Sequence, residues 1–270
     1  MYPDAYMQQI IQEEELLKIL QNTLTIIIPA YNEEEVIGKT LDEISTFILR
    51  NNLSWSVIVS VDGNDSTDRV VSSYSSNFPF VSMIKSNERS GKGAAVKRVL
   101  DRINSDYIIL MDADNSTNFQ SITDNLSFLQ EYDGIIFARY YYDNKIPLLR
   151  RFLSRSFNIL VQASLGIRIT DTQTGYKTFR SDIFKEGMRR VGPTNAFFDV
   201  ALLFFLKQEK VRIKEVKVRY NHRKGGKFNP VSGTLGLGIS LVAFRIRHSR
   251  FYKYIPESLV ELYYRKLKWI

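Results

Sequence analysis

The segment YIILMDADNST, residues 107–117, ends an apolar run with two carboxylates one residue apart, Asp112 and Asp114. Two neighbouring carboxylates repel each other and resist burial unless a positive partner neutralises them. The chain has no cysteine and only two histidines, which excludes thiolate sites and disfavours a zinc site or a histidine-based triad. A metal partner would therefore be a hard cation that takes oxygen ligands.

Polar clusters follow three earlier apolar runs as well. They are PAYNEEE (29–35), DGNDSTD (62–68) and NERSGKGAA (87–95). Asparagine, aspartate, serine and glycine commonly cap helices and form turns, which would explain any one of these clusters alone. Charged clusters after four successive apolar runs are harder to explain in this way, and they predict a single polar site.

The elements that must position these clusters are short, fully apolar strands that alternate with helical patterns. One helical pattern runs from Val36 to Ile48, and another starts at Lys92. This alternation predicts an α/β fold with a mostly parallel sheet covered by helices on both faces. Ligands of such sheets bind beyond the carboxyl ends of the strands, where the polar clusters lie. The expected strands are 24–30, 55–61, 80–84, 107–111 and 134–138.

The charge is distributed unevenly along the 270 residues, a length that suits one large domain or a main domain with a tail. Residues 207–270 contain 16 Lys or Arg and 4 acidic residues, whereas residues 1–206 contain 21 and 25. A basic tail of this kind favours phosphate or an anionic surface, although a solvated face of a soluble protein would show the same pattern. No apolar run is long enough to cross a bilayer, so no transmembrane helix is expected.

Together, IIIPAYNEEEVIGKTL, VDGNDSTD, GKGAAVKRVL and DAD resemble the family 2 inverting glycosyltransferases of the GT-A fold, over roughly residues 23–230. DTQTGYKTF (171–179), NAFFDVALL (195–203) and GGKF (225–228) are similar to the branch that glycosylates polyprenyl phosphates. This branch holds the dolichyl-phosphate glucose and mannose synthases, of which the glucose synthases are the closer match. The expected organisation is an amphipathic helix over 1–22, the GT-A domain over 23–230 and a basic amphipathic segment over 231–270.

The resemblance implies that Mg²⁺ or Mn²⁺ bridges Asp112 and Asp114 to the diphosphate of a nucleotide sugar, with Asp114 as the more direct ligand. Asp62 would accept a hydrogen bond from the base, but a carboxylate suits uracil and guanine alike, so the donor stays open between UDP-glucose and GDP-mannose. Ser116 stands where mannose synthases often have a further glutamine ligand. The implied donor-binding residues are Pro29, Tyr31, Glu33, Asp62, Lys92, Ala113 and Arg139.

The implied acceptor is a polyprenyl phosphate, which is largely dianionic at neutral pH and does not need a strong general base. We therefore expect Asp171, with Gln173 beside it, to position the sugar or the basic groups; the alternatives are a general base and a turn residue. Bringing two anionic substrates together requires cations. The residues expected to supply them are Arg139, Arg180, Arg223 and Lys227.

Two apolar helical patterns indicate how the chain meets a lipid acceptor. Residues 146–167 are interrupted by Arg150, Arg151 and Arg155, and residues 231–255 begin with an apolar stretch too short to span a bilayer. Both patterns suit helices in a membrane interface, although an ordinary buried helix would also fit the first. The sequence thus predicts a peripheral enzyme on the cytoplasmic face of a membrane that binds no nucleic acid.

Two other classes of function remain open at this point. One is a family 2 glycosyltransferase that acts on a soluble sugar or protein acceptor, with the basic tail binding a polyanion. The other is a non-catalytic nucleotide-sugar binding module, or a nucleotidyltransferase that shares the sheet architecture. Nucleotidyltransferases usually carry a glycine-rich basic loop after the first strand, and PAYNEEE is acidic and free of glycine.

Overall fold

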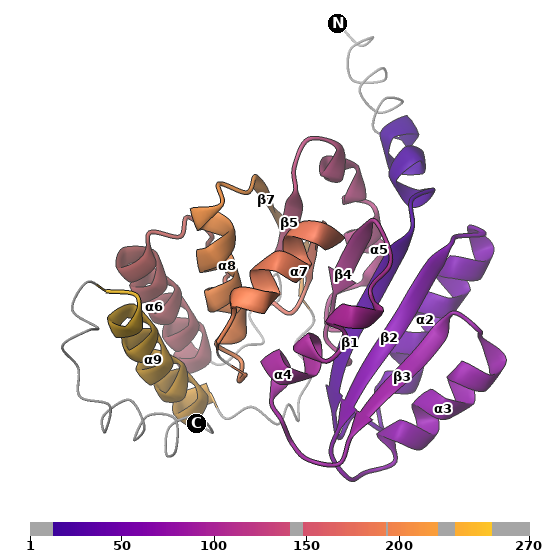
Figure 1. Ribbon diagram of the computed structural model, residues 1–270, viewed down its shortest axis with the longest axis horizontal. Coiled ribbons are helices and arrows are strands. Elements are labelled where there is room, and N and C mark those ends of the chain that lie inside the picture. The colour runs from indigo at the N-terminus through magenta and orange to yellow at the C-terminus, as the bar shows by residue number, and fades with distance from the viewer. Residues whose placement is uncertain (1–12, 141–147, 193, 221–229, 250–270) are drawn as a thin grey trace, which may run out of the picture.

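The computed structural model describes residues 13–140, 148–192, 194–220 and 230–249. Its centre is one seven-stranded sheet in the order β3-β2-β1-β4-β6-β5-β7, with helices on both sides (Figure 1). The strands are β1 (Leu24–Tyr31), β2 (Trp55–Asp62), β3 (Val81–Ser86), β4 (Tyr107–Leu110), β5 (Gly134–Tyr140), β6 (Lys177–Arg180) and β7 (Ile213–Arg219).

The predicted mostly parallel sheet is confirmed for the first half of the chain. Strand β1 pairs in parallel with β2 and β4, and β2 pairs in parallel with β3. Strand β6 lies antiparallel between β4 and β5, and β7 pairs in parallel with β5. Strands β6 and β7 were not predicted from the sequence. Strand β6 has only four residues, and β7 mixes charged with apolar side chains instead of forming an apolar run.

Alternate residues of the strands supply two separate cores, one on each face of the sheet. On β1, Ile27 packs with the first core, whereas Ile26 and Ile28 pack with the second. This alternation follows from the period of two along a strand, and it explains why the buried strands are apolar throughout. The first core is covered by α4 (Lys92–Lys97), α6 (Leu148–Leu165), α7 (Ser181–Arg190), α8 (Phe198–Gln208) and α9 (Pro230–Arg247).

The second core is covered mainly by α2 (Ile37–Arg50) and α3 (Thr67–Asn77), with the short α5 (Phe119–Thr123). The helical segment 13–20 adds Ile19 and Leu20 to this core. Two short 3₁₀ turns, η1 (Leu100–Arg102) and η2 (Leu126–Gln130), connect the elements around β4 and β5. Each parallel strand therefore lies between two apolar layers, and its carboxyl end is left to carry the polar residues.

The first half of the expected C-terminal segment is part of this folded body. Leu237, Leu241 and Phe244 of α9 are buried in the first core, and α9 lies beside α6 (Figure 1). No helix in the described parts of the chain combines the length and apolarity needed to cross a membrane.

Candidate active site

Four segments that follow strands meet in one cavity of about 270 Å³ at the carboxyl edge of the sheet. The lining residues come from the ends of β1 and β2, from the segment that leads into α4, and from the segment after β4. Because β1, β2 and β4 run in parallel, their ends are brought to the same edge. The lining residues are Pro29, Ala30, Tyr31, Glu33, Asp62, Arg89, Gly91, Lys92, Ala95, Asp112, Ala113 and Asp114.

Lys92 is the positive partner of the Asp112 carboxylate in the structure. Its Nζ lies 2.7 Å from Asp112 Oδ1, and both side chains are partly exposed to the cavity. Burial by itself raises the pKa of Asp112, but the positive charges of Lys92, Lys177 and Arg139 outweigh it, and the pKa lies below its ordinary value. Asp112 is therefore an anion at neutral pH.

Asp112 and Asp114 fit a divalent cation whose remaining ligands come from substrate phosphates. Mg²⁺ and Mn²⁺ prefer oxygen, and Mg²⁺ is usually bound by one or two carboxylates together with substrate phosphates. Within the described residues no group of three or more acidic or histidine side chains could form a complete metal cage. Ser116 is buried and does not line the cavity. Two carboxylates open to a cavity are thus the donor set that a metal–diphosphate requires.

Asp62 lies at the end of β2 and is engaged by its own chain on both carboxylate oxygens. Oδ1 accepts a hydrogen bond from Arg98 Nη1 at 2.9 Å. Oδ2 accepts bonds from the Ser90 backbone N–H at 2.9 Å and the Ser90 hydroxyl at 2.7 Å. Asp62 therefore also fixes the turn that precedes Lys92, a structural task that its predicted role as base acceptor did not include. A carboxylate has about four acceptor positions, so both tasks fit one side chain.

Arg89 is a lining residue that the sequence pattern did not indicate. The Cζ atom of its guanidinium lies 4.5 Å from the centroid of the Tyr31 ring, a cation–π arrangement at the cavity. The residue lies inside the polar segment NERSGKGAA. Nothing in the one-dimensional pattern indicates that an exposed arginine reaches back over a tyrosine from another strand end.

Arg139 and Asp171 form a bidentate ion pair beside this cavity. Arg139 Nε donates to Asp171 Oδ2 at 2.7 Å, Nη2 donates to Oδ1 at 2.8 Å, and the Arg139 backbone N–H donates to Oδ2 at 3.0 Å. Burial raises the pKa of Asp171, but the Arg139 guanidinium outweighs that effect, and the pKa is lowered below its ordinary value. A carboxylate held in this way is a weak base and a rigid anchor for the arginine.

Gln173 lies in the same segment and donates from Nε2 to the Ala196 carbonyl oxygen at 3.4 Å. Of the three arginines predicted for α6, Arg155 is exposed and Arg151 is partly buried. The side chain of Arg150, together with Arg223 and Lys227, lies outside the described part of the chain. Their expected roles stay predictions.

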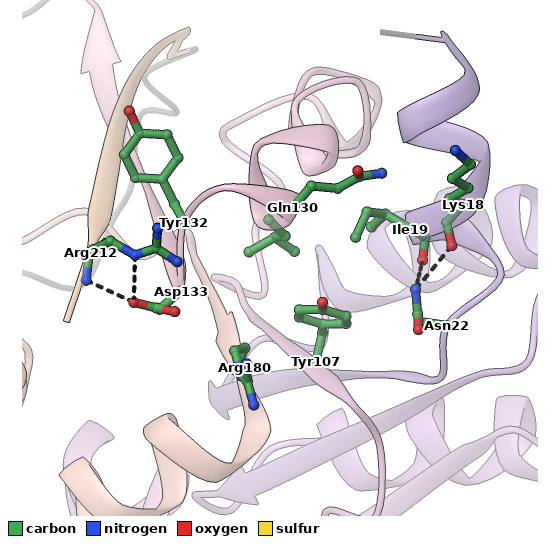
Figure 2. Close-up of a pocket in the computed structure, with 10 residues that line it drawn as sticks. Lys18, Ile19, Asn22, Tyr107, Gln130, Tyr132, Asp133, Arg180 and Arg212 are labelled. Atoms are coloured by element: carbon green, nitrogen blue, oxygen red, sulfur yellow. Dashed lines mark hydrogen bonds and ion pairs between the residues drawn. The ribbon is translucent and has the colours of Figure 1, made fainter. Parts of the chain in front are cut away.

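The predicted place of Arg180 in the site is wrong. Strand β6 runs antiparallel to β4, so Arg180 is paired with Tyr107 at the start of β4 instead of lying near Asp112 at its end. Asp112 follows Tyr107 by five positions, which corresponds to about 16 Å of extended chain. Arg180 contacts Asp182 and lines a different cavity on the far edge of the sheet, together with Lys18, Tyr107 and Arg212 (Figure 2).

Comparison with known proteins agrees with this geometry. The profile described as Glycosyl transferase family 2 matches residues 25–188. A dolichyl-phosphate beta-glucosyltransferase of Dictyostelium discoideum is 30% identical over 247 residues, which cover 83% of this chain and 74% of that protein. The human protein of the same name is 25% identical and is matched over 83% of this chain and 75% of its own.

Solved structures share the fold at low sequence identity. Glucosyl-3-phosphoglycerate synthase from Mycobacterium tuberculosis, in complex with Mn²⁺, UDP and glucosyl-3-phosphoglycerate, superposes with a TM-score of 0.62 at 15% identity, over 87% of this chain and 82% of that one. Mannosyl-3-phosphoglycerate synthase from Rubrobacter xylanophilus superposes with a TM-score of 0.62 at 19% identity, over 86% and 77% of the two chains.

Proposed function

The chain belongs to glycosyltransferase family 2, and we propose that it transfers glucose from UDP-glucose to dolichyl phosphate with inversion at the anomeric carbon. The observation that carries this proposal is the cavity in which two carboxylates and a lysine from different segments converge. Glucose and the lipid phosphate are supported by the names of relatives that match 83% of the chain. UDP is supported by the nucleotide bound in a structural neighbour.

Donor binding uses the residues of the cavity. Tyr31 and Arg89 flank the position of the nucleoside, with Asp62 accepting from the base. Asp112 and Asp114 would hold Mg²⁺ or Mn²⁺, which would neutralise the charge that develops on the leaving diphosphate. When the donor binds, its diphosphate would become a negatively charged partner of Lys92. The Lys92 ammonium, which contacts Asp112, already lies at the cavity wall. These side chains hold the donor with its anomeric carbon toward the Arg139–Asp171 pair.

The acceptor phosphate attacks this carbon from the side opposite the diphosphate. An oxygen lone pair of the phosphate forms the new bond to the anomeric carbon, the bond to the diphosphate breaks, and its electron pair leaves with UDP. A dianionic phosphate has no proton to lose in this step. Asp171 is therefore assigned to position Arg139, which offsets the repulsion between the two anionic substrates, and not to remove a proton.

The membrane side of the proposal rests on exposed apolar side chains of α6 and α9. Seven of the nine large apolar residues that are exposed in the described part of the chain belong to these two adjacent helices. They recur at helical spacing, which gives each helix an apolar stripe. We name this surface the α6/α9 face; it consists of Leu149, Phe152, Ile159, Leu160, Leu235, Val242 and Ile246.

Exposed arginines accompany the apolar stripes, with Arg155 on α6 and Arg245 and Arg247 at the end of α9. Apolar residues with arginines beside them suit a helix that lies in the headgroup region of a bilayer. Anionic lipids of the cytoplasmic leaflet would attract these cations. We accordingly place the enzyme on the cytoplasmic face of a membrane, where the α6/α9 face would meet the lipid acceptor.

The proposal is tested with a panel of donors and one acceptor. Purified protein is incubated with Mn²⁺, dolichyl phosphate in mixed micelles, and either UDP-glucose, UDP-galactose, UDP-N-acetylglucosamine or GDP-mannose. Mass spectrometry of the lipid fraction should show a hexose-phosphate lipid with UDP-glucose. A product from GDP-mannose alone would move the assignment to a mannosyltransferase, and no lipid product from any donor would contradict the proposed acceptor.

A further inference from the structure

A fully buried ion pair lies behind the cavity, and no step of the proposed transfer uses it. Lys177 on β6 and Asp199 on α8 are 2.6 Å apart, with side-chain exposures of 0% and 3%. Removing two charges from water is costly, and apolar residues of similar volume usually serve a core as well or better. A buried pair of this kind is therefore weak evidence for a role in stability, and its contacts suggest another role.

The Lys177 ammonium makes a second contact, to the backbone of a tight turn. It donates to the carbonyl oxygen of Thr174, three residues earlier. The Thr174 hydroxyl in turn donates to the Phe137 carbonyl oxygen on β5 at 2.7 Å. The turn formed by residues 174–176 is thus held by β5 through Thr174 and by the buried ion pair through Lys177.

This turn is the surface on which Asp112 rests. A Cβ atom added to Gly175 would lie 2.0 Å from Asp112 Oδ2 and 2.4 Å from Oδ1, so the carboxylate packs directly against the glycine backbone. The same carboxylate contacts Lys92 on its cavity side. Asp112 is therefore confined between Gly175 and Lys92, and its direction depends on where the 174–176 turn lies.

We propose that Lys177 and Asp199 are positioning residues for Asp112. They keep the 174–176 turn in the position in which the Gly175 backbone packs against the Asp112 carboxylate and directs it into the cavity. This inference rests on the proposed function in one respect, that Asp112 is a ligand of the metal–diphosphate. It predicts that loss of the pair weakens metal-dependent binding while the fold and the nucleoside subsite persist.

The test replaces the pair with apolar residues of similar size, Lys177→Met with Asp199→Leu, so that no buried charge is left alone. The matched control is Lys207→Met, which removes another lysine that donates to a backbone carbonyl, that of Leu165 at 2.9 Å beside the Gly166 turn. Three quantities are measured on each protein: the melting temperature, Mn²⁺ binding in the presence of UDP by electron paramagnetic resonance, and uridine binding by saturation-transfer NMR.

We expect the double variant to melt within a few degrees of the parent and to bind uridine normally, but to bind Mn²⁺ with UDP about 10- to 100-fold more weakly, the usual effect of losing a residue that orients a metal ligand. Lys207→Met should match the parent in Mn²⁺ and uridine binding. Parent-like Mn²⁺ binding in the double variant would overturn the inference. Loss of the fold, or an equal loss of uridine binding, would overturn it too, because the pair would then be merely structural.

Gly175→Ala tests the contact itself without altering the pair. The added methyl group must displace the Asp112 carboxylate, so Mn²⁺ binding with UDP should fall as in the double variant while uridine binding is kept. Unchanged Mn²⁺ binding in Gly175→Ala would contradict the role of the turn. A parent protein that binds no Mn²⁺ with UDP would instead contradict the proposed donor site, which keeps the two failures apart.

Discussion

At the scale of single residues, the decisive feature is the partner of Asp112. Lys92 Nζ lies 2.7 Å from Asp112 Oδ1. A metal ion that binds together with the donor diphosphate would compete with Lys92 for this oxygen. Asp114 also lines the cavity, and its Oδ1 accepts the Ser116 backbone N–H at 3.0 Å. We propose Asp114 as the more direct metal ligand, as the resemblance implies, so its loss should affect metal binding most strongly.

We predict that Asp114→Ala lowers transfer at least about 100-fold, because the charge on the leaving diphosphate loses its stabilising partner. Excess chelator should abolish the activity of the parent. The control is Asp101→Ala, which removes an exposed carboxylate from η1 and should leave the rate unchanged. Transfer at the parental rate in chelator would refute the metal assignment.

We also predict how kcat/KM depends on pH and that Asp171 does not set this dependence. The pKa of Asp171 is lowered in the folded chain, so its carboxylate is ionised at any pH above the ordinary aspartate pKa of about 3.9. The stability that this ion pair contributes is lost only as the pH falls through the lowered pKa of the folded state. An acid limb of kcat/KM at about pH 6 to 7 would then belong to the acceptor phosphate. We expect such a limb, followed by a plateau.

The matching variant is Asp171→Asn, which should retain measurable transfer with a loss below about 100-fold, since loss of a general base costs roughly 100- to 10,000-fold. Its melting temperature must be measured as well, because Arg139 loses its charged partner. A larger loss of kcat/KM that high pH restores would identify Asp171 as the base.

At the scale of elements, apolar runs were enough to predict the five strands and the edge of the sheet where the polar side chains meet. The pattern could not predict that β6 runs antiparallel to β4. Because of this direction, Arg180 lies at the edge of the sheet opposite to the candidate site. Lys177 and Asp199 lie within segments noted for their resemblance, but they are 22 residues apart. Only the folded chain shows that they pair behind Asp112.

We predict that the α6/α9 face contributes to membrane binding. Phe152 is 67% exposed on α6, and Phe152→Glu should weaken binding to anionic liposomes by placing a charge in the apolar stripe. Leu49→Glu is the matched control, because Leu49 is 59% exposed on α2, outside the face. Sedimentation of both variants with liposomes compares them directly. Equal losses would show that the face has no specific part in membrane binding.

At the scale of the whole molecule, the positive charge is concentrated toward the C-terminus, but α9 cannot be removed with it, since Leu237, Leu241 and Phe244 belong to the core. A truncation that keeps α9 removes only residues 250–270, which carry five Lys or Arg and two Glu. Each cation near an anionic leaflet contributes about 1 kcal/mol, and salt screens the effect.

We predict that a chain ending at residue 249 binds anionic liposomes more weakly than the full chain, with the difference disappearing at high salt. Its binding of Mn²⁺ with UDP should be unchanged, because the cavity lies between residues 29 and 114. Liposome binding equal to that of the full chain at low salt would contradict the role of this segment.

A lipid phosphate and a soluble phosphate can be compared as acceptors in one competition experiment. One reaction contains UDP-glucose, Mn²⁺, dolichyl phosphate in anionic liposomes and an excess of 3-phosphoglycerate, the kind of soluble acceptor indicated by the names of the structural neighbours. Mass spectrometry measures glucose in the lipid and aqueous fractions. We predict that glucose appears on the lipid phosphate; glucose found on the soluble acceptor, with none on the lipid, would contradict the proposed function.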